Sequence, residues 1–288
     1  MAGRPPIDLN QKVRELLVHT VPLRFGIDAP IRNFEERTNA CFNLIKYIDD
    51  HISAQSVYRA SYDLHRSLLD RMVLVSLVEA FERFIKESAV VCVDAIAPFT
   101  IDDRFDKFTP TGGSLAAQFK ARSVGKAMCE SDTWLSNQTI NERFRFILKP
   151  HFGDPWEYVF PNERQNPASE RDRASTLAIL WQVRHNITHN TGILTDNDAR
   201  RLTLMVKTEI ASGKILSPNL SDLRYVKRFL VETANHTNNR IGLRLAELLT
   251  ERYQDDATLF VPQELADSIS GSFQQSLTIN GFAGSVNA

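Results

Sequence analysis

Residues 74–85 read LVSLVEAFERFI, and this stretch decides the fold class. Its apolar residues recur at intervals of three and four, the spacing that places side chains on one face of an α-helix. The pattern continues in both directions and predicts one helix from about Leu64 to Ile96. Pro98 ends this helix, because the residue before a proline disfavours the helical conformation.

Helical spacing also dominates the chain before this stretch. A short helix is expected at residues 9–20, and Asn33 is predicted to be the N-cap of a second helix. The side chains that this second helix is predicted to bury are Cys41, Leu44, Ile45 and Ile48.

More helices are predicted after residue 113. Their ranges are 114–129, 133–148, about 171–190, 195 to about 212, and Leu220–Tyr253. Pro150 ends the second of them, and Gly192 closes the third in a left-handed conformation. Thr195 and Asp198 resemble a capping box at the start of the fourth. The fifth is one long helix or two, because the polar run 235–239 and Gly242 weaken its middle.

No convincing run of alternating strand residues occurs, so the predicted class is all-α. Residues 99–113 and 151–167 hold glycines and prolines and are predicted to be irregular connections. We expect an N-terminal helical extension over 1–60, a helical bundle over 61–255, and a flexible or partner-docking tail over 256–288.

Composition narrows the function classes. The 288 residues include 43% hydrophobic and 24% charged residues, which permits a large core and excludes global disorder. The net charge of -1 excludes a uniformly basic nucleic-acid-binding surface. Three scattered cysteines favour a reducing compartment, and no apolar run approaches the roughly 20 residues of a membrane span. We therefore expect a soluble cytoplasmic protein that does not enter a membrane.

Residues 181–190 read WQVRHNITHN and carry the candidate chemistry. With about 100° of rotation per residue, Arg184 falls in the middle of the apolar face, while His189 lies at its edge about 140° away. A buried arginine needs a neutralising partner. One interpretation is structural: Arg184 pairs with Glu79 or Glu82, and the histidines only complement the helix C-terminus.

The other interpretation is catalytic, because arginine and histidine together suit metal-free RNA cleavage. Histidine can carry the protons of the 2′-hydroxyl and the leaving oxygen, and a guanidinium can stabilise the phosphorane. One segment supplies a single such set, so two copies facing each other across a two-fold axis would supply both acid and base.

The motif resembles the signature of the HEPN superfamily (higher eukaryotes and prokaryotes nucleotide-binding). The matching residues are Arg184-His185-x-x-x-His189, the continuation 190–193 (NTGI), and the Phe-Glu-Arg-Phe segment within 76–85. The resemblance covers roughly residues 62–250. It implies an up-down helical bundle, here with additional N-terminal helices, that dimerises around a composite cleft.

The resemblance also implies an activity and roles. Active members are metal-independent endoribonucleases that leave a 2′,3′-cyclic phosphate and act as toxins or in antiviral defence. Arg184 would polarise the phosphate, His189 would be the general acid or base, and His185 would orient them. Glu82, or less favourably Glu79, would be the acidic support, and Asn190 would support the motif. Implied partners are RNA, a second copy, and an antitoxin or other regulatory protein.

Three further points complete the expectation. His185 and His189 have metal-ligand spacing, but no glutamate lies between them and no third ligand is evident, so neither a metal nor another cofactor is predicted. Residues 199–254 are rich in lysine and arginine. Arg200, Arg201 and Lys207 could line an RNA path, although such a run is more often a solvated surface. The alternative function is a catalytically inactive HEPN scaffold that binds nucleotides or partners.

Overall fold

The computed structural model describes residues 29–52, 59–97, 103–105, 108, 123–129, 134, 136–149 and 168–255. All regular structure within these residues is helical, apart from one isolated antiparallel bridge between Ile193 and Ile215, which confirms the all-α prediction for them. The expectations for residues 9–20, 109–122, 151–167 and 256–288 lie outside the described residues.

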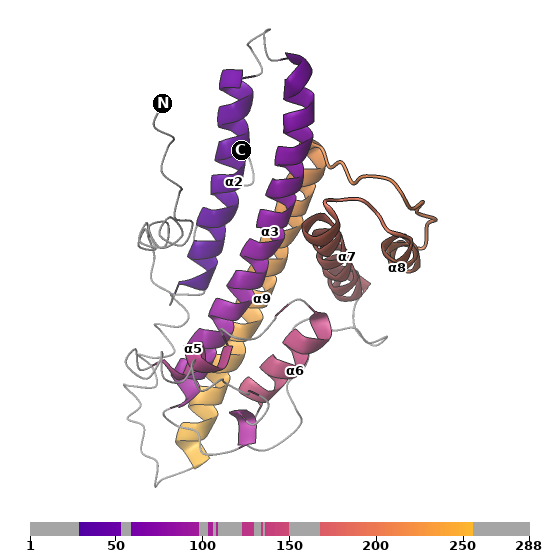
Figure 1. The fold of residues 1–288 in the computed structure, drawn as a ribbon. Coiled ribbons are helices and arrows are strands. Elements are labelled where there is room, and N and C mark those ends of the chain that lie inside the picture. The colour runs from indigo at the N-terminus through magenta and orange to yellow at the C-terminus, as the bar shows by residue number, and fades with distance from the viewer. Residues whose placement is uncertain are drawn as a thin grey trace, which may run out of the picture.

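Seven α-helices and one 3-10 turn make up the described fold (Figure 1). They are α2 (Pro30–Ile52), α3 (Arg59–Ile96), η3 (Asp103–Phe105), α5 (Val124–Cys129), α6 (Asn137–Ile147), α7 (Ala168–Asn190), α8 (Asp196–Val206) and α9 (Leu220–Asp255).

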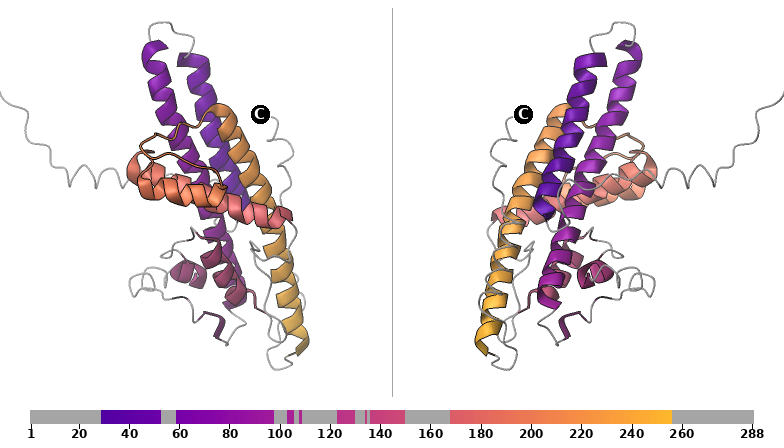
Figure 2. Two further views of the ribbon diagram at one scale, coloured as in Figure 1. Left: turned by 90° about the vertical axis from the view of Figure 1, so that its right-hand side faces the viewer. Right: turned by 90° about the vertical axis from the view of Figure 1, so that its left-hand side faces the viewer.

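Three long helices form the body of the molecule. Asp49, late in α2, bonds Arg66, early in α3, while Asn33, early in α2, bonds Glu87, late in α3, so these two helices are antiparallel. Helix α9 lies beside them and runs in the same direction as α3 (Figures 1 and 2). Helices α7 and α8 lie across the middle of α3, and α5 and α6 lie near its C-terminal end (Figure 1).

The stretch that decided the fold class is the centre of the core. Phe81, Phe84 and Ile85 are fully buried, and the ring of Phe34 from α2 packs against both phenylalanines. Burying each such side chain contributes about 1.5–3 kcal/mol. Helix α2 therefore shares one core with α3, although it belongs to the predicted N-terminal extension 1–60; the boundary after residue 60 stays a prediction.

The predicted cap of α2 is wrong. The helix begins three residues before Asn33, at Pro30, a residue type that suits the first helical position. Asn33 is buried inside the helix and donates to Glu87, which also pairs with Arg37 and Arg83. Leu44 was predicted to be buried but is 48% exposed, whereas Ile45 is buried.

Other helix ends also differ from the predictions. Helix α5 is described from Val124, where the Asp94 carboxylate accepts from Ser123 and from the Gly125 N–H; residues 114–122 of the predicted helix lie outside the described residues. Helix α6 begins at Asn137 with Ser136 as its N-cap, not at residue 133. Helix α8 ends at Val206, well before residue 212, because Lys207 takes a left-handed conformation.

The structure tests the predicted end of α3 and the continuity of α9. Helix α3 ends at Ile96 as predicted, although it begins five residues before Leu64. Helix α9 is continuous, which answers the question of one helix or two. Across the described ranges, no helix has both the length and the apolar character to cross a membrane.

Candidate functional site

The C-terminal end of α7 carries the candidate motif and has a fixed termination. Thr191 and Gly192 both have positive φ, and the Gly192 N–H donates to the Asn186 carbonyl, so the prediction of a left-handed Gly192 is confirmed. A Cβ atom at Gly192 would lie 3.2 Å from Cδ of Arg71 on α3. The chain therefore turns sharply here, close against α3, and then leads into α8.

A buried carboxylate ties the end of α7 to the start of α8. The predicted capping box is confirmed, since the Asp198 N–H donates to Oγ1 of Thr195. The Asp198 carboxylate also accepts from the side chains of Gln182, Asn186 and Asn190 at 2.9–3.1 Å. These amides lie on the face of α7 turned away from its apolar arc, and Asn190 helps to tie the end of α7 to α8; its supporting role in the motif stays a prediction.

Hydrogen bonding decides the charge of this carboxylate. Burial alone would raise the pKa of Asp198, but hydrogen bonds from Thr195, Asn186 and Asn190 outweigh that effect and hold the pKa below its ordinary value. Asp198 is therefore an ionised acceptor at neutral pH. The sequence identified its pairing with Thr195 but not the three amides, because they come from the helix before it.

Arg184 lies on the inner face of α7, as its position in the apolar arc predicted. Its Nη2 donates to Oε1 of Glu79 on α3 at 2.9 Å. Only 17% of the Arg184 side chain is exposed, compared with 48% of Glu79. Its Nε–H is buried and has no hydrogen-bond acceptor among the described residues. The guanidinium thus has one acidic partner at the surface and one unused donor directed inward.

Arg184 pairs with Glu79 rather than with Glu82, although a catalytic role for either glutamate stays a prediction. Glu82 was preferred over Glu79, but Glu79 holds Arg184, whereas an oxygen of Glu82 accepts from the Trp134 N–H at 3.5 Å. The two glutamates are three residues apart on one helix, so the choice between them depends on where α7 crosses α3. The sequence alone does not predict where α7 crosses α3.

His185 and His189 are both exposed and lie one turn apart on α7. Their ring centroids are 4.5 Å apart with a tilt of 46°. Counted around the helix, the two histidines lie about 100° and 140° from Arg184. Within the described residues no hydrogen bond joins either ring to Arg184 or to a carbonyl at the helix end. One copy of the chain therefore presents two free imidazoles beside a separately paired guanidinium.

The predicted RNA-contacting residues lie on the neighbouring element. Arg200 and Arg201 are exposed on α8, and Lys207 is exposed at its C-terminal cap. Helices α7 and α8 pack against each other, so this basic group and the motif belong to one part of the molecule. No hydrogen bond or ion pair between described residues occupies these three charges.

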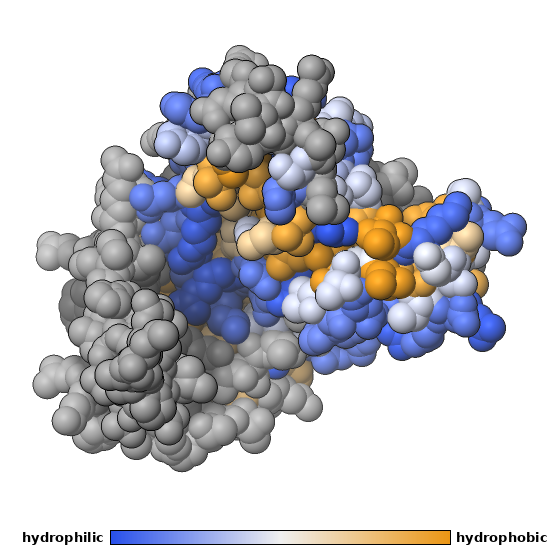
Figure 3. Space-filling view, turned by 45° about the horizontal axis from the view of Figure 1, so that its top comes forward, coloured by the Kyte–Doolittle hydropathy of each residue, from blue (hydrophilic) through white to orange (hydrophobic). Residues whose placement is uncertain are grey.

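Exposed apolar side chains near the motif were missed by the sequence analysis. Leu68 and Met72 are 50% and 58% exposed, and on α3 they lie within about 20° of the direction of Glu79. Ile193, Ile215, Leu204 and Met205 are also exposed, after α7 and on α8. Figure 3 shows apolar side chains gathered on this side of the molecule. The sequence does contain a signal for this surface, because the apolar residues Leu68 and Met72 are four residues apart and lie opposite the core-facing positions of α3.

The site contains no described metal-binding constellation. Where the structure describes the chain, no three histidine, cysteine, aspartate or glutamate residues are grouped closely enough to hold an ion. The expectation that no metal or other cofactor takes part remains a prediction.

Comparisons with known proteins complete the description of the site. Neither the models of protein families, nor the curated proteins, nor the solved structures contain a match to this chain.

Proposed function

We propose that this protein is a metal-independent endoribonuclease of the HEPN type, with an active site formed by two copies of the chain. Arg184 binds and polarises the scissile phosphate, His189 acts as general acid or base, and His185 orients them. The products are a 2′,3′-cyclic phosphate and a 5′-hydroxyl. In the cell such an enzyme acts as a toxin or a phage-defence effector, which requires an antitoxin or other regulator.

One observation carries this proposal: α7 presents a paired arginine and two free, adjacent imidazoles at the same end. An imidazole can donate or accept a proton and so can serve as a general acid or base. The acidic partner of Arg184, Glu79, is 48% exposed, so the ion pair lies where an incoming phosphate could replace the carboxylate. A dianionic phosphorane competes for the guanidinium better than the singly charged carboxylate of Glu79.

The need for two copies follows from the distribution of these groups. Cleavage requires one group to remove the 2′-hydroxyl proton and another to protonate the leaving oxygen. Within one chain the histidines are turned well away from Arg184, so a two-fold partner could bring its own imidazoles opposite the guanidinium. Exposed Leu68 and Met72 lie on the same stripe of α3 as Glu79, and an interface there would cover them.

A second candidate function is an inactive HEPN scaffold. The ion pair between Arg184 and Glu79 favours it, because a neutralised arginine needs no substrate phosphate to explain its burial. In this case the exposed apolar side chains dock a partner protein, and the histidines have no chemical role.

Expression in cells separates the two candidates. The ribonuclease predicts growth arrest by the wild-type chain that disappears with Arg184→Ala and with His189→Ala. His51→Ala is the matched control, because His51 is also an exposed histidine but belongs to α2 rather than to the proposed interface stripe on α3. All variants are checked for folding by circular dichroism and for oligomeric state by sedimentation. Equal toxicity in every variant, or no toxicity in any, contradicts the enzyme and favours the scaffold.

A further inference from the structure

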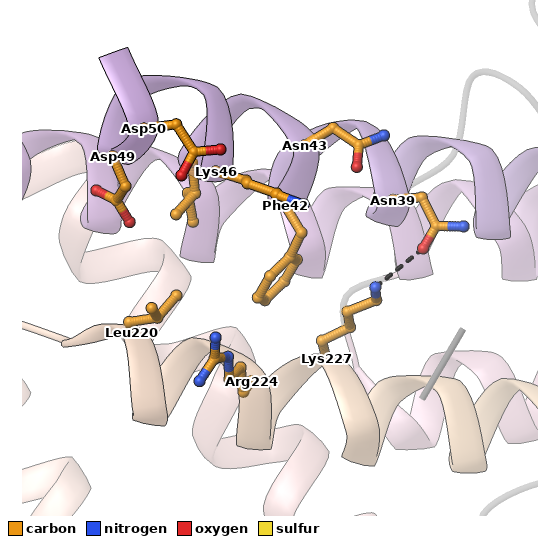
Figure 4. Close-up of a pocket in the computed structure, with 10 residues that line it drawn as sticks. Asn39, Phe42, Asn43, Lys46, Asp49, Asp50, Leu220, Arg224 and Lys227 are labelled. Atoms are coloured by element: carbon orange, nitrogen blue, oxygen red, sulfur yellow. Dashed lines mark hydrogen bonds between the residues drawn. The ribbon is translucent and has the colours of Figure 1, made fainter. Parts of the chain in front are cut away.

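A cavity of about 580 Å³ lies between α2 and the start of α9 (Figure 4). Its volume is in the range of small-molecule sites. Helix α2 supplies the residues of one wall, from Asn39 to Asp50, and α9 supplies Leu220, Arg224 and Lys227. The cavity is separate from the candidate active site, because Arg184 contacts α3 from α7 rather than from α2 or α9.

The cavity has a cationic end. Lys227 donates to Oδ1 of Asn39 at 2.9 Å, and its ammonium lies 4.7 Å from the ring centroid of Phe42. Arg224, one turn earlier on α9, also lines the cavity, on the other side of the Phe42 ring from Lys227 (Figure 4). Neither cation forms an ion pair with a described residue. The cavity lining carries three cations, Lys46, Arg224 and Lys227, against two carboxylates, Asp49 and Asp50, and this excess of positive charge attracts an anion.

Burial makes the Lys227 charge costly. Desolvation lowers the pKa of Lys227, and the negative charge of Glu35 offsets only part of that effect. A bound anion would restore the interactions that the ammonium lost on leaving water. An anion bound next to Lys227 therefore interacts directly with the ammonium, in addition to the long-range attraction of the positive charges that line the cavity.

The end of the cavity away from Lys227 is lined by two carboxylates, Asp49 and Asp50, and by Lys46 (Figure 4). Asp49 is held by Arg66 and Tyr62, which hold the pKa of Asp49 below its ordinary value although burial opposes this. Asp50 lies beside it with no partner among the described residues, and the amide of Asn43 lies along the same wall (Figure 4). Carboxylates and amides accept hydrogen bonds from hydroxyl groups. The two ends thus select different parts of one ligand.

We propose that this cavity binds a small phosphorylated polyhydroxy compound, with its phosphate between Arg224 and Lys227 and its hydroxyl groups toward Asn43 and Asp50. Guanidinium and ammonium groups are the common protein ligands of phosphate. A ligand with only the phosphate uses one end of the site, and a neutral sugar uses only the other. The proposal is independent of the ribonuclease activity, and neither depends on the other.

Calorimetric titration of the full chain with ribose 5-phosphate tests the proposal. We expect one site per chain, with affinity at least tenfold higher than for inorganic phosphate or for ribose. Arg224→Gln and Lys227→Met each lower the affinity at least tenfold. Arg228→Gln is the matched control, because Arg228 lies one turn after Arg224 on α9. It is exposed and pairs with Glu232 outside the cavity.

The variants remain informative if one of them is unstable. Arg224 is exposed and unpaired within the described residues, so its substitution leaves the fold intact, and thermal melting confirms this. Asp50→Asn should weaken ribose 5-phosphate but not inorganic phosphate. Absence of saturable binding by wild-type protein overturns the proposal. So does equal affinity for ribose 5-phosphate and phosphate, or an equal loss in Arg228→Gln and Arg224→Gln.

Discussion

At the scale of single residues, Arg184 shows what a sequence can and cannot predict. Its place within the apolar arc of α7 follows from the helical rotation alone, and the structure confirms that it is mostly buried. Its partner depends on the crossing of α7 and α3, so Glu79 could not be chosen over Glu82 beforehand. The guanidinium is thus held in position by an exposed carboxylate that a substrate could displace.

Glu79→Gln should strengthen RNA binding about threefold to tenfold, because it removes the anion that competes for Arg184. The free energy of unfolding should change by less than about 1 kcal/mol, since Glu79 is half exposed and such pairs contribute little. Fluorescence anisotropy with a labelled RNA and urea denaturation measure the two effects. Glu82→Gln is the control, and equal effects of both variants would show that Glu79 does not screen the site.

Asp198→Asn should lower the free energy of unfolding by about 1–3 kcal/mol at pH 7, because the hydrogen-bond acceptors for Thr195 and three amides are weakened. The folded-state pKa of Asp198 is depressed, so its contribution is present above the unfolded-state pKa and declines as pH falls through the folded-state value. Urea denaturation at pH 7 and at pH 3 should therefore show a large difference between variant and wild type that narrows in acid. A constant difference would contradict this.

At the scale of elements, helix existence was predictable and helix ends were not. Regular apolar spacing located every helix that the structure describes, because that spacing is a property of the segment itself. The ends depend on distant partners: Asp94 from α3 bonds the first described turn of α5, and Glu87 lets Asn33 lie inside α2. Helix α9 remained ambiguous, because its polar middle resembles a break. Packing on α3 and α2 overrides that local preference.

In the polar middle of α9, a buried hydroxyl without a partner in the described part of the chain lowers the free energy of unfolding. The side chain of Thr233 is fully buried, and its hydroxyl has no hydrogen-bond partner among the described residues. Thr233→Val keeps the shape and removes the unsatisfied group, so it should raise the free energy of unfolding by about 1 kcal/mol. The converse substitution at the buried neighbour, Val231→Thr, should lower it. Chemical denaturation of both variants checks this; a clear loss of stability in Thr233→Val would reveal a partner for the hydroxyl.

At the scale of the whole molecule, the proposed active site and the proposed ligand cavity lie on different helix pairs around α3. The apolar stripe of Leu68 and Met72 extends toward Glu79 on the α7 side, while the cavity opens between α2 and α9. The sequence indicated the need for a second copy through the chemistry of the motif. It did not identify the surface that would meet that copy.

Met72→Glu should weaken the proposed dimer more than tenfold, because it introduces a charge into the apolar stripe that also contains Glu79. Sedimentation across a range of protein concentrations measures the dissociation constant. Leu243→Glu serves as the control, since Leu243 is an equally exposed apolar residue on α9, away from the stripe. If both variants dimerise like the wild type, the interface lies on another face.

The most direct test of the central claim is digestion of RNA by purified protein in the presence of EDTA, followed by analysis of the new ends. We expect cleavage that leaves 2′,3′-cyclic phosphate and 5′-hydroxyl ends, with rates at least a hundredfold lower in Arg184→Ala and His189→Ala than in wild type or His51→Ala. Cleavage that requires a divalent metal, or that persists unchanged in both variants, would contradict the account.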